Sequence, residues 1–177
     1  MDEIKLDLTD RKILYELDKN TRISNAQLAR KVKKSRESVK YRINQLQQKG
    51  ILQGFITSIN PNKLGYHMFK VYLKLENNPK ERKKFYTSLK QNKDIYWLGI
   101  SDGAFDSVLA ILAKSTVEYF VIINQLFNKW QHLIISKTLG TMVDTKQYNK
   151  KFFLENSKES ATKVVTFGAE VVENSID

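Results

Sequence analysis

The chain has 177 residues and a hydrophobic fraction of 41%, enough for a folded core, and its 30 Lys and Arg against 19 Asp and Glu give a net charge of +11. The absence of cysteine excludes disulfides and thiolate metal sites, and the two histidines, His67 and His132, lack metal-ligand spacing, so we expect no metal and no cofactor. No apolar run reaches the ~20 residues of a membrane span, and the polar N-terminus is unlike a signal peptide, so we expect a cytoplasmic protein without a membrane partner.

Residues 10–20 predict a first helix. Ile13, Leu14 and Leu17 recur at helical spacing, and Thr9 stands where an N-cap is expected. This helix lies in the most basic third of the chain, because residues 1–60 contain 13 Lys and Arg against 7 Asp and Glu. A local excess of positive charge favours a polyanionic partner.

Residues 24–50 predict two further helices joined by a tight turn. Ser24 is the N-cap of the first, with Gln27 in the position of a capping box, and Ser35 is the N-cap of the second, which Gly50 ends. The second helix has an apolar stripe of Val39, Ile43 and Leu46. Eight Lys or Arg and one acidic residue lie between positions 30 and 49. A helix that is apolar on one side and cationic on the other suits the major groove of DNA, which indicates a helix-turn-helix.

Residues 51–66 predict a β-linker between two domains. The segment ILQGFITSI is rich in strand-forming residues and stops at Asn60-Pro61, since proline cannot donate to a strand ladder. We place the domain boundary between Ile59 and Tyr66.

Residues 67–143 predict a domain of the order β-α-β-β-α-β. Apolar and polar residues alternate over 67–75, a helix starts at Pro79, and two strands flank the hairpin turn at 102–104. A second helix follows a capping box of Ser115 and Glu118, and residues 132–143 form the last strand. We expect that second helix to bury four apolar residues, Phe120, Val121, Leu126 and Phe127. This order is the ferredoxin-like split motif.

Residues 144–177 form a C-terminal extension with a less regular pattern. KKFFL and KVVTFGAEVV predict strands, and ENSKESAT predicts the loop between them. Two roles stay open for this extension: a strand added to a dimer, or a linker into a further module.

Five motifs in this order resemble the Lrp/AsnC family of prokaryotic transcription regulators. They are LDLTDRKILYEL, ISNAQLARKV, SRESVKYRINQLQQKGIL, NPNKLGY and GAFD. The resemblance covers about residues 6–143 and implies an α+β protein with an N-terminal three-helix, winged-type helix-turn-helix domain (1–50), a β-linker (51–66) and a C-terminal ferredoxin-like domain (67–143). It also implies a sequence-specific transcription regulator that binds double-stranded DNA as a homodimer or higher oligomer.

The resemblance places the helix that follows Ser35 in the major groove. Arg36 can then read guanine and Glu37 can accept from cytosine, while lysines contact phosphates. The whole predicted DNA-binding set is Lys33, Lys34, Ser35, Arg36, Glu37, Ser38, Lys40, Tyr41 and Arg42. Three alternatives remain: this surface is only a solvated helix face, Arg42 braces the first helix instead of contacting a phosphate, and Tyr41 lies against the neighbouring helix.

One departure from the family pattern lies in the turn before this helix. Lys33-Lys34 stands where the family usually has glycine and an apolar residue. If the turn requires a positive φ, a lysine there carries a steric cost.

The resemblance also implies dimerisation and an amino acid or similar metabolite as effector in the second domain. The effector would bind near Gly103 and Asp106, where glycine allows close approach and the carboxylate can pair with an α-ammonium group. The alternative is structural: the Asp-Gly turn closes a hairpin, and Asp106 caps it.

Two other classes of protein share part of these sequence features. An architectural protein that coats DNA with little sequence preference also fits the charge. Siroheme decarboxylases resemble the same two-part fold, but their proline-rich flanks are missing, and neither paired carboxylates nor a nucleophile–base set appears. We therefore predict that the protein is not an enzyme.

Overall fold

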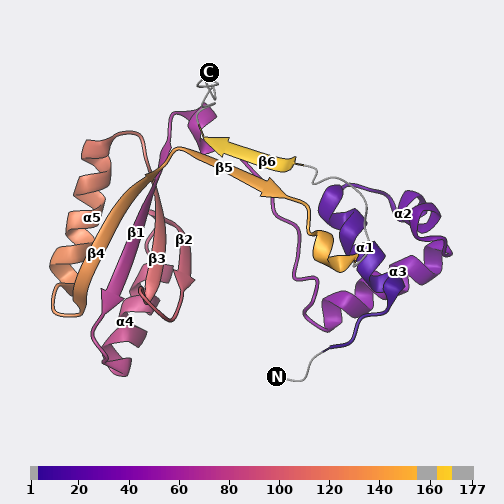
Figure 1. The fold of residues 1–177 in the computed structure, drawn as a ribbon, viewed down its shortest axis with the longest axis horizontal. Coiled ribbons are helices and arrows are strands. Elements are labelled where there is room, and N and C mark those ends of the chain that lie inside the picture. The colour runs from indigo at the N-terminus through magenta and orange to yellow at the C-terminus, as the bar shows by residue number, and fades with distance from the viewer. Residues whose placement is uncertain (1–3, 155–162, 169–177) are drawn as a thin grey trace, which may run out of the picture. The chain divides into compact units, whose positions relative to one another are not determined.

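The computed structural model describes residues 4–154 and 163–168 and has an α+β fold (Figure 1). Residue contacts divide the chain into two compact units. The first combines Met1–Ser58 with Lys146–Thr166, and the second combines Ile59–Thr145 with Phe167–Asp177. We call them the helical unit and the sheet unit.

Three short helices build the helical unit: α1 (Leu8–Lys19), α2 (Asn25–Val32) and α3 (Arg36–Gln48). The capping box of Ser24 and Gln27 is present, and Gly50 has a φ of +69° just after α3, as expected. The N-cap of α1 is Asp7 rather than Thr9, because the Asp7 carboxylate accepts the Asp10 N–H at 2.8 Å. The buried core of the unit consists of Ile13, Leu14, Leu17, Leu28, Ala29, Val32, Val39 and Leu46.

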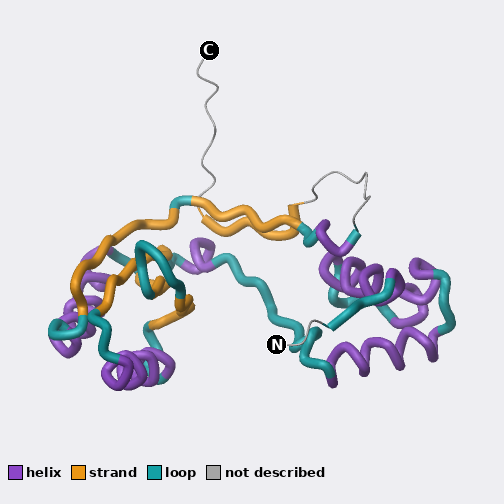
Figure 2. The backbone as a smooth tube through the Cα atoms, turned by 60° about the horizontal axis from the view of Figure 1, so that its bottom comes forward, coloured by secondary structure: helices purple, strands orange, loops and turns teal. Residues whose placement is uncertain are grey.

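The predicted strand of the β-linker is not formed. Residues 53–60 have no regular structure (Figure 2), and a 3-10 helix, Pro61–Leu64, follows. A strand requires a hydrogen-bonded neighbour, and this segment pairs with no strand of the described chain. Its apolar side chains Phe55, Ile56 and Ile59 are consequently exposed.

The sheet unit has the predicted β-α-β-β-α-β order. Its elements are β1 (His67–Leu75), α4 (Pro79–Lys90), β2 (Ile95–Ile100), β3 (Ser107–Ala113), α5 (Thr116–Trp130) and β4 (Ile134–Met142). The strands lie in the order β2-β3-β1-β4, and each neighbouring pair is antiparallel. This is the ferredoxin-like arrangement, so the predicted fold is confirmed.

The sheet packs one face on α4 and α5 (Figure 1). Phe69, Val71, Leu73 and Leu75 alternate inward from β1, as predicted. The predicted buried stripe of α5 is partly wrong, because Phe120 and Val121 are exposed while Leu126 and Phe127 are buried. The true stripe is Tyr119, Ile123, Leu126, Phe127 and Trp130, whose spacing keeps one helical face inward.

The extension after β4 forms β5 (Asp144–Tyr148), a 3-10 helix (Lys151–Phe153) and β6 (Lys163–Gly168), and β5 pairs with β6. The strand predicted at KKFFL is therefore wrong, whereas KVVTFG is a strand. The predicted loop ENSKESAT and the end of the second predicted strand lie outside the described residues. Among the described helices, none combines the length and the apolarity needed to cross a bilayer.

Candidate nucleic-acid interface

The turn between α2 and α3 is tight and left-handed. Lys33 has φ 55° and ψ 51°, and it is the non-glycine residue of the described chain with a positive φ. The Lys34 N–H donates to the Ala29 carbonyl at 3.0 Å, which closes the end of α2. The turn therefore has the conformation that glycine adopts most easily, so the condition left open by the sequence is met, and lysine at this position costs about 1 kcal/mol.

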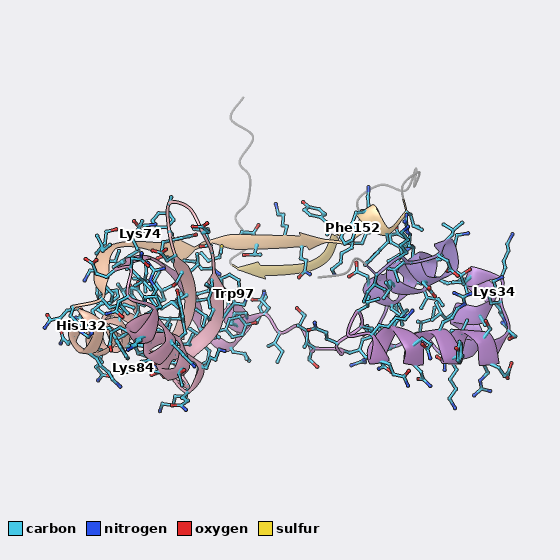
Figure 3. The ribbon with its side chains drawn as sticks, turned by 90° about the horizontal axis from the view of Figure 1, so that it is seen from below. Lys34, Lys74, Lys84, Trp97, His132 and Phe152 are labelled. Carbon is cyan, nitrogen blue, oxygen red and sulfur yellow. The ribbon has the colours of Figure 1, made fainter. Side chains whose placement is uncertain are left out.

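The N-terminal half of α3 presents a polar, cationic surface. Ser35 caps the helix by accepting the Ser38 N–H at 3.1 Å, while Val39 and Leu46 anchor the opposite side in the core. Figure 3 shows Lys34 at this end of the helical unit. The exposed members of the predicted DNA-binding set are Lys33, Lys34, Ser35, Arg36, Glu37, Lys40 and Tyr41, and Ser38 is half-buried.

The geometry of α3 bears on the alternatives for Tyr41 and Arg42. Tyr41 is 64% exposed, so its ring does not lie against a neighbouring helix. Arg42 instead reaches back to α1, where its Nη1 lies 2.7 Å from Asp7 Oδ2 and 2.7 Å from Asp10 Oδ1. Of the two alternatives for Arg42, a phosphate contact and a brace on the first helix, the structure therefore contains the brace.

This brace stabilises the charged forms of Asp7 and Arg42. The Asp10 N–H, followed by the Arg42 guanidinium, lowers the pKa of the Asp7 carboxyl. The same two carboxylates raise the pKa of Arg42. Arg42 therefore fixes the angle of α3 against α1 as a permanently charged cross-link.

The exposed face of α3 continues to Asn44, which the sequence prediction missed. Asn44 is exposed and lies one helical turn after Lys40. The signal was the four-residue spacing from Lys40, which places both side chains on one face. An asparagine amide can pair bidentately with adenine.

The hairpin between β2 and β3 brings Gly103 and Asp106 to the end of β1. Gly103 is exposed with a φ of +122°, and its carbonyl accepts from Lys74 Nζ at 2.8 Å. Asp106 is buried: Oδ2 accepts the Leu75 N–H at 2.8 Å, and Oδ1 lies 3.2 Å from Arg82 Nη1. Both carboxylate oxygens therefore bond to β1 and α4, which gives Asp106 a structural role, although not as a cap of the hairpin.

The charge of Asp106 is stabilised by these neighbours. Burial raises the pKa of the carboxyl, but the Leu75 N–H and the charges of Arg82 and Lys74 outweigh it, so the pKa lies below its usual value. The carboxylate ties β1, β3 and α4 together.

Residues 149–153 of the extension pack on the helical unit. Asn149 is buried and its Nδ2 donates to the Tyr15 hydroxyl at 2.9 Å. The Lys150 N–H donates to Asp18 Oδ2 at 2.7 Å, and its ammonium pairs with the same carboxylate. Phe153 packs against the helical core. No local sequence pattern predicts these contacts, because they join positions more than 130 residues apart.

Residues 4–154, whose side chains are described, contain no group of three potential metal ligands. His132 lies 3.5 Å from Glu81, at the surface of the sheet unit. Neither histidine meets a second one.

Comparison with known proteins gives the following similarities. Residues 6–53 match the family described as winged helix-turn-helix DNA-binding. A proline dehydrogenase transcriptional activator from Rhodobacter capsulatus is 28% identical over 139 residues, 77% of this chain and 90% of the relative. The leucine-responsive regulatory protein of Escherichia coli K12 is 27% identical over 148 residues, 82% of this chain and 90% of the relative.

Among solved structures, a transcriptional regulator from Neisseria meningitidis in complex with L-Met has a similar fold. Its TM-score is 0.69 at 19% identity, and the match covers 78% of this chain and 90% of that one. This structure supports the fold of both units but, at that identity, nothing about individual residues.

Proposed function

We propose that the chain is a transcription regulator of the Lrp/AsnC type, and that it reads a specific operator in double-stranded DNA with the N-terminal half of α3. The observation that carries this proposal is an exposed cationic helix surface whose other side is buried and braced to α1 by Arg42. The named relatives are regulators, so the function is regulation rather than catalysis. A protein that acts on a prokaryotic chromosome works in the cytoplasm.

The side chains of α3 divide into two groups by chemistry. Arg36, Glu37 and Asn44 carry donors and acceptors that can distinguish base edges in the major groove. Lys33, Lys34 and Lys40, with Ser35, Ser38 and Tyr41, supply contacts to phosphates, which add affinity without sequence information. Arg42 acts as a positioning residue for the helix.

The test is binding to genomic DNA fragments and to random duplex at two salt concentrations. A regulator retains a few fragments at high salt, and those fragments identify the operator. Arg36→Ala should then weaken operator binding by about 1–3 kcal/mol and relax one base position. The matched control is Arg22→Ala, which removes an exposed arginine outside α3. Uniform binding that collapses with salt would establish the architectural protein instead.

We assign dimerisation to the face of the sheet that α4 and α5 leave uncovered. On this face Lys70 lies 4.5 Å from the centroid of the Trp97 ring, and Tyr72 packs beside Phe105 at 5.2 Å. Trp97 is 49% exposed in the single chain, and an aromatic surface of this kind favours burial by a second copy. Sedimentation of the wild type and of Trp97→Ala tests it, since loss of the interface yields monomers.

The domain roles follow from these assignments. The DNA-reading domain is residues 1–50, and residues 51–66 connect it to the second domain. The second domain, residues 67–143, dimerises and senses an effector. The extension from residue 144 onward supports the DNA-reading domain. For the effector we propose an amino acid bound at the hairpin of Gly103 and Asp106. The solved relative in complex with L-Met supports this ligand class.

At this hairpin, the exposed Gly103 backbone allows close approach, and Asp106 positions Lys74 and Arg82. Calorimetric titration with each amino acid tests the site. Gly103→Val should abolish the heat of binding, because a β-branched residue is strained at a φ of +122°. Equal heats for both proteins would remove the hairpin from the site.

A further inference from the structure

An open groove of about 600 Å³ lies on the helical side of the sheet unit, away from the hairpin and from the uncovered sheet face. Lys80, Lys83 and Lys84 of α4 line it on one side, and Lys129 and Trp130 of α5 line it on the other. All four lysines are exposed. Figure 3 shows Lys84 on this unit.

The groove has an uncompensated positive charge. No carboxylate lines it among the described residues. Glu81 pairs with Lys84 at 2.8 Å, but Lys80 and Lys83 have no ion-pair partner within the described residues. Residues 59–145 as a whole carry twelve Lys and Arg against seven Asp and Glu, a net charge of +5. This excess is separate in sequence from the helix-turn-helix and is not used by it.

Trp130 forms the aromatic part of the lining. Its ring packs edge-on against Phe85 at 5.3 Å, and the ammonium of Lys129 lies 5.8 Å from its centroid. The residue is only 7% exposed, and its indole N–H has no hydrogen-bond acceptor within the described structure.

We propose that this groove, which we call the α4–α5 groove, binds the phosphate backbone of duplex DNA as a second contact outside the operator-reading helix. The proposal rests on the proposed function, since α3 holds the DNA in the protein's vicinity and so raises its effective concentration at the groove. Phosphates complement a lysine-lined surface without carboxylates.

The geometry favours a polymer over a small ligand. Small-molecule sites enclose most of their ligand, whereas this groove is open and its cations are exposed. Lysines act as flexible point charges, in contrast to the planar fork with which arginine fixes one phosphate. Lys80, Lys83 and Lys84 lie at i, i+3 and i+4, so they gather on one side of α4. Such a cluster suits successive phosphates.

The test compares two full-length triple variants with the same change of charge. The groove variant is Lys80→Gln, Lys83→Gln and Lys129→Gln. The control variant is Lys63→Gln, Lys93→Gln and Lys114→Gln, three exposed lysines of the sheet unit that do not line the groove. Affinity for random duplex and for the operator is measured as a function of salt, and thermal melting confirms that both variants are folded.

The groove variant should flatten the plot of log affinity against log salt. Each phosphate contact contributes about −0.9 to the slope, so three contacts remove about 2.7, which is roughly a 40-fold smaller loss of affinity between about 50 and about 200 mM salt. The control variant should keep the wild-type slope. Equal slopes for the groove and control variants, with operator binding intact, would overturn the groove proposal alone.

Two other outcomes separate the proposals. Wild-type protein that binds no DNA would overturn the proposed function together with this inference. Inorganic phosphate is the probe for a small ligand, and it is tested in a Trp97→Phe background, where the remaining fluorescence is that of Trp130 in the lining. Saturable quenching by phosphate that the groove variant loses, combined with an unchanged DNA slope, would overturn the DNA assignment and point to a phosphorylated metabolite.

Discussion

The side-chain amide of Asn149 donates a hydrogen bond to the hydroxyl of Tyr15 at 2.9 Å, and both side chains are buried. The bond joins the C-terminal extension to the first helix of the DNA-reading unit across 134 positions of sequence. Together with the pair between Lys150 and Asp18, it makes residues 149–153 a structural part of that unit. The chain therefore passes between the two units near residues 58, 145 and 166.

Asn149→Ala should destabilise the helical unit by about 1–2 kcal/mol, because it leaves the buried Tyr15 hydroxyl without its donor. Urea unfolding followed by circular dichroism measures the loss. Gln147→Ala, an exposed neighbour on β5, is the control and should change stability little. In a double-mutant cycle with Tyr15→Phe, the two losses should not add, since both remove one bond. Strict additivity would contradict a direct interaction.

Lys33→Gly should stabilise the helical unit by about 1 kcal/mol, because glycine adopts the left-handed conformation of Lys33 without steric cost. Lys34→Gly removes the same charge from a neighbouring position that lacks a positive φ, so it should not stabilise. Thermal melting distinguishes them. A lower melting temperature for Lys33→Gly than for the wild type would show that the turn carries no such strain.

Arg42→Ala should lower stability by about 1 kcal/mol, since it breaks a partly exposed pairing with Asp7 and Asp10. It should also weaken binding to the operator and to random DNA by a similar factor, because it affects the angle of α3 rather than a base contact. Fluorescence anisotropy on both duplexes measures this. A selective loss on the operator would instead assign Arg42 a base-reading role.

Acid should weaken the sheet unit through Asp106. Its pKa in the folded protein lies below the ordinary value of 3.8, so the folded state holds the ionised carboxylate more firmly than the unfolded chain does. The stabilisation is complete above the unfolded pKa and is lost as the pH falls below it, toward the folded pKa. The free energy of unfolding, measured from pH 6 down to about pH 2, should decrease as the pH falls below the unfolded pKa of Asp106.

The Asp106→Asn variant tests the origin of that acid dependence. It should be less stable by about 2–3 kcal/mol at neutral pH, because hydrogen bonds to a charged group are lost or weakened. Its stability should also fall less steeply below pH 4. An unchanged acid profile would assign the dependence to other carboxylates.

Local sequence patterns were sufficient for most elements. Ser24, Ser35 and Asn78 mark helix starts through side chains that accept N–H groups within three residues, and alternation along β1 gives its buried face. These signals act over a few residues, so they can be read from the sequence. Alternation, caps and the hairpin turn likewise predicted the split β-α-β-β-α-β order that the sheet confirms.

Where more than one local pattern fitted the same residues, the sequence predicted the structure less well. Residues 119–121 are all apolar or aromatic, so spacing alone did not show that Tyr119 rather than Phe120 faces the sheet. Asp7 replaced Thr9 as the cap of α1 because its carboxylate also binds Arg42, a partner from another helix. Strand propensity at 51–59 produced no strand, since a ladder needs a neighbouring strand.

The sequence by itself determined a helix-turn-helix whose second helix is cationic and a ferredoxin-like second domain, while the positive φ of Lys33 came from the structure. Only the tertiary structure decided that Arg42 braces α1, that Asp106 is fully paired, that the extension docks on Tyr15 and that four lysines gather at the α4–α5 groove. The physical reason is the distance along the sequence that separates the interacting residues. Caps and periodicities arise between residues close in sequence, whereas these contacts depend on which distant side chains folding brings within hydrogen-bonding or Coulombic reach.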